Sequence, residues 1–423
     1  MKRYAKVIPL LGLTDATARI WLPLAVGLAV GLRATLGIMH TFLFPDSPDY
    51  LQLAKAILSH EAYMAGGNFA ARMPGYPVFI ALIFELFRNT NEKAILLAQA
   101  LMGGACVVMV YSLGRRVSHA VGLAAAFLAA LDPLSIGFSA AVLTETPYTF
   151  FLLLALCIAV RIMEGRRFGR LPDWASWVLL GLVWGIGIYF RGSALWGIVP
   201  VTGWMAVVRK RNGEETSHGR ALGYAVLAIV ISFMTLVPWQ MRNYRLFHNG
   251  AMRLTTLEGM SLYEAVYPGA DGGPKQPEIP VPPEIKTMDE AQRSDEWSRR
   301  AWKEIETDPL RIAKLGVMKF GRTWSPTFNA AEFKKIGPIQ VLMALWHIPL
   351  FLLALLGIPR VSWALRILLL IPVVYFSLIH ALFLGSVRYR VPLMPIVCVF
   401  SAAGLMGLWK WLRSGKRYSA QAV

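Results

Sequence analysis

The sequence predicts an all-α polytopic membrane protein, and three observations support this fold class. Hydrophobic residues make up 56% of the 423 residues and charged residues only 16%, whereas soluble domains average roughly 45–50% and about 25%. Several apolar runs approach or exceed the roughly 20 residues that cross a bilayer. Short basic segments separate these runs, as is typical of cytoplasmic loops. This composition excludes a soluble enzyme, a disordered tail and a disulfide scaffold.

The apolar runs predict about ten transmembrane helices with both termini in the cytoplasm. The first run, residues 20–44, follows a basic segment, is too long for a signal-peptide core and is expected to be a retained anchor. The other spans are expected at residues 94–111, 120–137, 146–162, 174–190, 194–208, 221–239, 338–356, 364–384 and 391–409. Residues 74–87 are apolar but too short to span, and they predict an interfacial helix.

Residues 244–337, called the polar segment below, divide the chain. The polar segment holds 13 of the 25 acidic residues and 14 basic ones, so its net charge is +1 against +17 for the rest. Because Lys and Arg collect in cytoplasmic loops, we expect this segment outside the membrane. The predicted organisation is an N-terminal transmembrane module over 1–243 with a first outer loop at 45–73, then the polar segment, then C-terminal transmembrane helices and a cytoplasmic tail over 338–423.

Two helices are expected within the polar segment. Thr287 and Glu290 have the spacing of a capping box, which predicts a helix to about Thr307. Asp308 followed by Pro309 is typical of an N-cap with proline at the first helical position. This pair predicts a second helix that ends near residue 324.

The net charge of +18 would suggest a nucleic-acid partner in a soluble protein. Cytoplasmic loops explain it here, so no nucleic-acid binding is expected. The seven histidines show no metal-binding spacing, and no dedicated metal site is predicted.

Charged residues at the outer ends of the predicted spans are the functional candidates, because ionisable groups at a membrane boundary are costly. The positive-inside rule does not explain arginine on that face. Carboxylates and arginines gathered on one face suit acid–base chemistry on a substrate that carries an anionic group. The candidates are Asp46, Asp49, Arg72, Glu145, Arg191, Arg242 and Arg388.

Each type of candidate also has a structural alternative. Asp46 fits a turn in the sequence Pro-Asp-Ser-Pro. Asp49 could cap the following helix or assist Asp46. Glu145 could instead cap its own helix, where the helix dipole favours a negative charge. Arg191 and Arg242 fit side chains that reach out to lipid headgroups.

The motifs around these residues resemble the C-type (GT-C) glycosyltransferase superfamily, in its bacterial branch similar to protein O-mannosyltransferases and lipid A aminoarabinose transferases. The run PDSPDYLQLAKAIL (45–58) resembles the first outer loop of that superfamily, with Asp46 four residues before Tyr50. RMPGYPVFIALIFELF (72–87), LTETPY (143–148), VPWQMRNYRLF (237–247) and VRYRVPLMP (387–395) follow in the superfamily's order. The resemblance implies a GT-C-like bundle with interfacial helices in its first outer loop.

The resemblance also implies a mechanism, in which a sugar on a polyprenyl phosphate is transferred with inversion to an acceptor hydroxyl. By position Asp46 is the general base, and its partial burial is expected to raise its pKa. Ser47 stands where some members of the superfamily carry a second acidic residue next to the aspartate. Asp49 would then supply the missing second carboxylate. Glu145 would orient the acceptor or hold a cation. The residues expected to bind substrate are Tyr50, Arg72, Arg191, Arg242 and Arg388.

The sequence thus predicts a hexosyl- or pentosyltransferase of the cytoplasmic (inner) membrane, with its active site on the extracytoplasmic face. Its acceptor would be an envelope glycolipid, polysaccharide or protein. No cofactor is certain; a divalent cation would have Asp46, Asp49 and Glu145 as its oxygen ligands. The alternatives are a multi-pass transporter or lipid flippase and a non-catalytic envelope-assembly protein. A transporter would place polar residues near the midplane and often show an inverted repeat.

Overall fold

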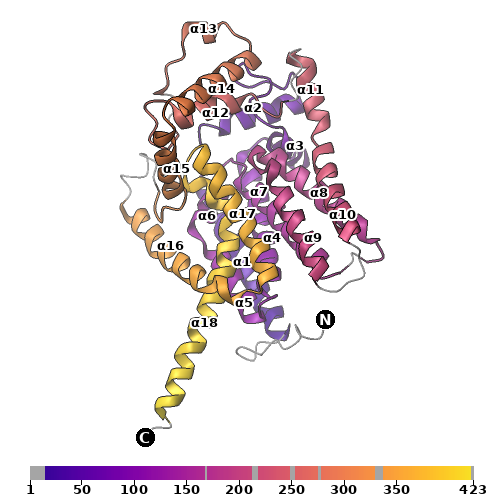
Figure 1. Cartoon of the computed structure of the whole chain (residues 1–423), viewed down its shortest axis with the longest axis vertical. Coiled ribbons are helices and arrows are strands. Elements are labelled where there is room, and N and C mark those ends of the chain that lie inside the picture. The colour runs from indigo at the N-terminus through magenta and orange to yellow at the C-terminus, as the bar shows by residue number, and fades with distance from the viewer. Residues whose placement is uncertain are drawn as a thin grey trace.

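The computed structural model is a bundle of helices that is covered at one end by a smaller layer of helices (Figure 1). It describes residues 15–166, 169–211, 218–247, 253–274, 278–328 and 337–420. Within these ranges the regular elements are helices, joined by two isolated β-bridges. The end that carries α2 (Ser47–Leu58), α12 (Leu257–Val266) and α14 (Glu290–Thr307) is called the capped end below, and it lies at the top of Figure 1.

The predicted polytopic bundle is confirmed. Two bent pairs, α5 (His119–Leu131) with α6 (Pro133–Ser139) and α10 (His218–Met234) with α11 (Val237–Phe247), bring the number of candidate spans in the described ranges from seven to nine. The tenth predicted span is the shorter pair of η1 (Gly192–Gly197) and α9 (Ile198–Arg211). The seven single helices are α1 (Asp15–Met39), α4 (Glu92–Gly114), α7 (Glu145–Met163), α8 (Asp173–Phe190), α16 (Gly337–Gly357), α17 (Trp363–Leu382) and α18 (Met394–Ala420).

The span predicted as one helix at 120–137 is instead bent by 52° between α5 and α6. Pro133 begins α6 and removes a backbone donor, while the Asp132 carboxylate accepts the Ser135 N–H at 2.9 Å as an N-cap. Asp132 is fully buried and lies 3.3 Å from His347 Nε2 of α16. Trp346 donates to the same carboxylate at 3.2 Å. This buried polar contact ties the bend to α16, and it was not predicted.

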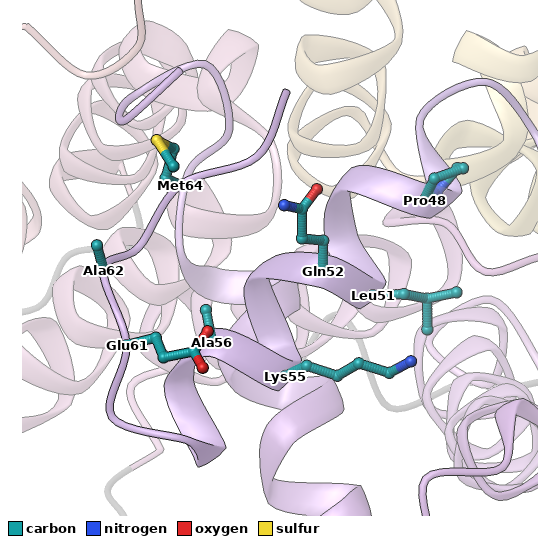
Figure 2. A pocket seen from close by; sticks show the side chains of 8 residues that line it. All are labelled: Pro48, Leu51, Gln52, Lys55, Ala56, Glu61, Ala62 and Met64. Carbon is teal, nitrogen blue, oxygen red and sulfur yellow. The ribbon is translucent and has the colours of Figure 1, made fainter. Parts of the chain in front are cut away.

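The helices predicted to follow Asp46 in the first outer loop and to span residues 74–87 are present as α2 and α3 (Gly75–Phe87). In α2, Tyr50, Leu53 and Ala54 form the buried face that helical spacing places on one side. The opposite face lines a hollow of about 530 Å³ between α2 and the loop that follows it (Figure 2). That hollow is lined by Pro48, Leu51, Gln52, Lys55, Ala56, Glu61, Ala62 and Met64.

The first span ends at Met39, not at residue 44 as predicted, because the chain then runs extended beside the segment before α7. Phe42 N donates to Ala140 O at 3.0 Å, and Val142 N donates to Phe42 O at 3.3 Å. The Ser47 hydroxyl donates to Val142 O at 3.0 Å. These bonds bring the start of α2 next to the start of α7.

The polar segment contains α12, α13 (Pro283–Lys286), α14 and α15 (Pro309–Thr323) in its described part. The capping box that begins α14 pairs Asp289 with Gln292, so the predicted cap at Thr287 is two residues too early. The predicted end of this helix at residue 307 and the Asp308 cap of α15 are confirmed. α15 packs along α17, where Trp324 Nε1 donates to Ser377 Oγ at 2.9 Å.

α16 and α18 approach each other closely at two glycines. A Cβ atom at Gly404 would meet the Leu353 carbonyl, and one at Gly357 would meet the Phe400 carbonyl. Gly404→Ala should therefore lower the free energy of unfolding by roughly 1–3 kcal/mol, as overpacking does. Thermal unfolding in detergent micelles measures this. Gly203→Ala is the matched control, because no atom of the described ranges lies within 4 Å of its Cβ position. Equal melting temperatures of the two variants would contradict the prediction.

Candidate active site

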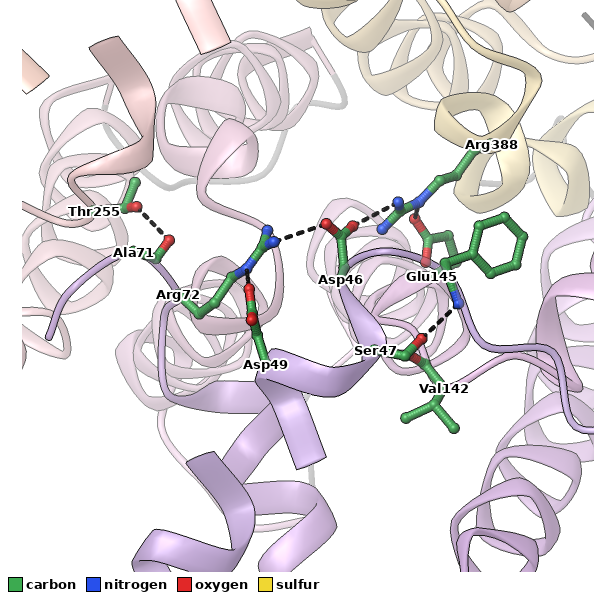
Figure 3. A network of polar contacts seen from close by, with 10 residues as sticks. Asp46, Ser47, Asp49, Ala71, Arg72, Val142, Glu145, Thr255 and Arg388 are labelled. Carbon is green, nitrogen blue, oxygen red and sulfur yellow. Dashed lines mark hydrogen bonds and ion pairs between the residues drawn. The ribbon is translucent and has the colours of Figure 1, made fainter. Parts of the chain in front are cut away.

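Two parts of the first outer loop meet the start of α7 and a turn near the C-terminal end of the chain at the capped end of the bundle (Figure 3). Asp46 directly precedes α2, and its side chain makes no capping bond, so its carboxylate is available to other partners. Glu145 is the first residue of α7. Arg72 lies in the loop before α3, and Arg388 lies in η5 (Val387–Leu393).

These residues form a continuous chain of ion pairs of alternating sign, called the Asp46 network below. Arg72 Nη2 lies 2.8 Å from Asp46 Oδ1, and Arg388 Nη1 lies 2.7 Å from Asp46 Oδ2. Arg388 Nε is 2.5 Å from Glu145 Oε1, and Arg72 Nε is 3.1 Å from Asp49 Oδ2. Three carboxylates and two guanidinium groups thus lie in contact, and Asp46 is at the centre.

The network is largely removed from solvent. The Glu145 side chain is 1% exposed and the Asp46 side chain 24%. Burial alone would raise the pKa of Asp46, but the nearby guanidinium groups of Arg388 and Arg72 outweigh it, and the pKa lies below its usual value. The expectation of a raised pKa is therefore wrong. Its physical reason is that two arginines, 26 and 342 residues away in sequence, bind the same carboxylate.

The structural alternatives for the acidic residues do not describe their main contacts. Asp49 binds Arg72 as an assistant to Asp46 would, and Glu145 binds Arg388. Ser47 has a backbone role: its hydroxyl accepts from Phe44 N at 2.9 Å in addition to its bond to residue 142.

Tyr50 packs against the Arg72 side of the network. Its ring centroid is 5.5 Å from the Arg72 guanidinium carbon, and it meets the Tyr76 ring edge-on at 5.0 Å. Burial raises the pKa of Tyr50 to about 12, so its hydroxyl stays neutral. Tyr50 therefore supports Arg72.

Arg191 lies beside the network, in a group that we call the Arg191 cluster. Its guanidinium stacks over the rings of Tyr148, Phe376 and Tyr389 at 5.7, 6.0 and 5.4 Å, and it forms no ion pair within the described ranges. Tyr148 is one turn after Glu145, and Tyr389 is next to Arg388, so the cluster adjoins the network. Four buried polar atoms here have no hydrogen-bond partner among the residues that the structure describes: Arg191 Nη1, Tyr148 Oη, Ser193 Oγ and Glu145 Oε2.

Arg242 lies on a different part of the capped end. Its Nη1 donates to Phe69 O at 2.7 Å and its Nη2 to Tyr63 O at 3.2 Å, both in the first outer loop. Its guanidinium also stacks over the Trp239 ring at 4.6 Å. The structure therefore joins six of the eight predicted site residues, places Arg191 next to them, and places Arg242 against the loop that leads to Arg72.

Two features of the site had no signal in the sequence. Tyr389 stacks on His380 of α17 with ring centroids 4.1 Å apart, which fixes the ring next to Arg388. Glu290, considered in the sequence only as part of a capping box, binds the loop before Arg72. Tyr389 lies in the run 387–395 and Glu290 in the predicted capping box, but neither pattern indicates these contacts, which arise only in the folded chain.

The carboxylates do not form a metal-binding group in this arrangement. Across the described ranges, no three His, Cys, Asp or Glu side chains are placed to hold a metal ion. Asp46, Asp49 and Glu145 each have an oxygen bound to arginine.

Comparisons with known proteins agree with this fold and with the position of the motifs. Residues 71–239 match the family described as dolichyl-phosphate-mannose-protein mannosyltransferase. The chain is 27% identical over 207 residues to the undecaprenyl phosphate-alpha-4-amino-4-deoxy-L-arabinose arabinosyl transferase of Pseudomonas aeruginosa (strain UCBPP-PA14). The match covers 47% of this chain and 36% of that relative, so the chain spans about a third of its length.

The same architecture is found in solved structures of the Archaeoglobus fulgidus oligosaccharyltransferase. The complex with an inhibitory peptide and a dolichol-phosphate superposes with a TM-score of 0.56 at 16% identity, over 95% of this chain and 51% of that chain. The complex with Zn and sulfate gives a TM-score of 0.55 at 15% identity, over 93% and 49%.

Fold and motifs together define a multi-pass membrane protein that is similar to membrane glycosyltransferases. The family match and the curated relative support the resemblance to the C-type (GT-C) glycosyltransferase superfamily found in the sequence, and the solved structures share its fold.

The Asp46 network makes a prediction about stability. Arg388→Gln should lower the free energy of unfolding by about 3–5 kcal/mol, because it leaves the buried Glu145 carboxylate without its cation. The double variant with Glu145→Gln should recover part of this loss. Unfolding of the purified protein in detergent micelles measures both. Arg299→Gln, which removes an arginine with a 66% exposed side chain, is the control and should change little; an equally mild effect of Arg388→Gln would show that the network is not stabilising.

Proposed function

We propose that this protein transfers a sugar from a polyprenyl-phosphate donor to an extracytoplasmic acceptor of the cell envelope, with Asp46 as the general base. The observation that supports this most directly is the Asp46 carboxylate held between Arg72 and Arg388 and linked to Glu145. An acid–base group and fixed cations in one partly buried site suit transfer of a group away from a phosphate.

In the proposed reaction, the oxygen of an acceptor hydroxyl bonds to the anomeric carbon as the bond from that carbon to the phosphate oxygen breaks. The hydroxyl proton goes to Asp46, and polyprenyl phosphate leaves with the bonding electrons. Attack opposite to the leaving group inverts the anomeric carbon. A hydroxyl is a poor nucleophile at neutral pH, and a positioned base contributes roughly 10²–10⁴-fold.

Arg191 is the most suitable cation for the donor phosphate. Arg191 and Arg242 are the two candidate arginines without an ion pair in the described part of the chain. Both terminal nitrogens of Arg242 donate to backbone carbonyls, whereas Arg191 Nη1 is buried among aromatic rings and has no hydrogen-bond partner there. An unpaired cation in such surroundings is costly, so an anionic ligand would be favoured there. The unpartnered Tyr148 hydroxyl is a further donor to a phosphate oxygen.

The lowered pKa of Asp46 suggests how donor binding prepares the base. A carboxylate held by two guanidinium groups is a weak base. A donor phosphate beside Arg388 would compete with Asp46 for this guanidinium. The guanidinium would then stabilise the Asp46 carboxylate less, and the pKa of Asp46 would rise. Base strength would then increase only when a donor is present.

The relatives support the donor class. One is named for an undecaprenyl phosphate-linked sugar, and one solved structure contains a dolichol-phosphate. We place the site on the extracytoplasmic face of the inner membrane because the polar segment, at the capped end, carries little of the chain's excess positive charge. The acceptor is a glycolipid, polysaccharide or protein that reaches this face.

The proposal predicts that Asp46→Asn abolishes transfer while the protein still folds and inserts. Mass spectrometry of envelope glycans and glycolipids, with and without the gene, identifies the sugar that is lost; complementation with each variant then shows which restores it. Asp295→Asn, a 60% exposed carboxylate of the polar segment, is the control and should restore it fully. Full restoration by Asp46→Asn would remove Asp46 as the base.

A second prediction concerns pH. Arg72→Gln removes one of the two guanidinium groups that lower the pKa of Asp46, so this pKa should rise. Because the base works only when deprotonated, the acid limb of the kcat/KM profile should move to higher pH. The profile is measured with the purified enzyme in proteoliposomes, with Arg299→Gln as control. An acid limb that stays in place would mean that Asp46 does not set it.

A further inference from the structure

The backbone immediately before Arg72 is held by the polar segment. Phe69 N and Ala70 N donate to the two carboxylate oxygens of Glu290, at 2.6 and 3.0 Å. Thr256 N donates to Ala70 O at 3.0 Å. The Thr255 hydroxyl donates to Ala71 O at 2.8 Å, as Figure 3 shows.

Glu290 is an unusual residue for such a contact. It is 8% exposed, and within the described ranges no cation forms an ion pair with it. Its partners are the two backbone N–H groups and the hydroxyl of Thr256. A buried carboxylate is tolerated only when hydrogen bonds replace its hydration, and its place in the first turn of α14 adds the favourable end of the helix dipole. Because the buried Glu290 carboxylate needs these hydrogen bonds, it holds the backbone of residues 69 and 70 in one position relative to α14.

The same loop carries the guanidinium that holds the proposed base. Arg72 is two residues after Ala70, and its side chain binds Asp46 at 2.8 Å and Asp49 at 3.1 Å. A shift of the 69–71 backbone would therefore move the guanidinium away from Asp46. Misplacement of a reacting group by about 1 Å can cost roughly 10²-fold in rate.

We propose that Glu290 is a positioning residue: it fixes the 69–71 backbone, and through Arg72 it sets the position of Asp46. This inference rests on the proposed function of Asp46. It also gives the polar segment a part in catalysis, because α14 holds the backbone before Arg72 through this side chain.

Glu290→Gln tests the proposal. A carboxamide keeps the size but offers one accepting oxygen, and its NH₂ group faces an N–H donor. We expect kcat to fall by about 10–100-fold, with the KM for the donor little changed and the acid limb displaced to higher pH, as predicted for Arg72→Gln. Glu306→Gln, an exposed residue near the end of the same helix, is the matched control and should behave as the wild type.

A double-variant cycle separates positioning from a general loss of structure. If Glu290 acts through Arg72, then Glu290→Gln should lower the rate of the Arg72→Gln enzyme by less than about twofold. An equal fold-loss in both backgrounds would overturn the proposal. If Glu290→Gln does not fold, Thr255→Val replaces it as the test variant. Thr255→Val removes one hydrogen bond to the same loop without removing a charge, and it should lower kcat in the same way but by less.

Hydrogen–deuterium exchange gives a readout that needs no turnover. Amides at the start of α2 should exchange faster in Glu290→Gln and in Arg72→Gln, and the double variant should add nothing to the latter. Unchanged exchange there in Glu290→Gln would refute the positioning role. Absence of transfer by the wild-type protein would instead refute the proposed function and leave this result intact.

Discussion

The structure depends on the ion pairs among Asp46, Glu145 and Arg388, which are largely buried. Glu145 is almost fully buried, and removing one ion of a buried pair is far more costly than never having had the pair. Arg388 must therefore reach Glu145, and once there its second nitrogen binds Asp46. This requirement joins the beginnings of α2 and α7 to the turn before α18, so that the capped end of the bundle has one charged centre.

The packing of the helices serves this centre. The extended stretch after α1 pairs with the segment before α7, and the Ser47 hydroxyl joins the two at Val142. Tyr50 supports Arg72, and Tyr389, stacked on His380, supports the turn that carries Arg388. Apolar and aromatic contacts thus set the positions of charges that would otherwise repel or take up water.

Much of this was predictable from sequence because membrane insertion imposes strong constraints. Apolar runs and basic loops indicate the spans, and the Asp46 and Arg72 motifs lie within one loop. What the sequence could not indicate were relations between distant segments. Neither the lowered pKa of Asp46 nor the contact of Glu290 with residues 69 and 70 follows from local pattern. The bend at Pro133 was missed because hydropathy alone does not register a capped proline inside an apolar run.

The Asp46 network suits the proposed reaction because the total charge of the site would not change during transfer. A sugar phosphodiester carries one negative charge, and the departing phosphate monoester gains a second. Asp46 loses one negative charge when it accepts the hydroxyl proton. In the proposed reaction the total charge of the site would therefore be the same in donor complex and product, while negative charge would move from Asp46 toward the phosphate. Arg388 contacts Asp46 directly, and the Arg191 cluster adjoins it, so guanidinium groups lie along this path before the reaction begins. Preorganised cations of this kind lower a barrier without having to reorient during the step.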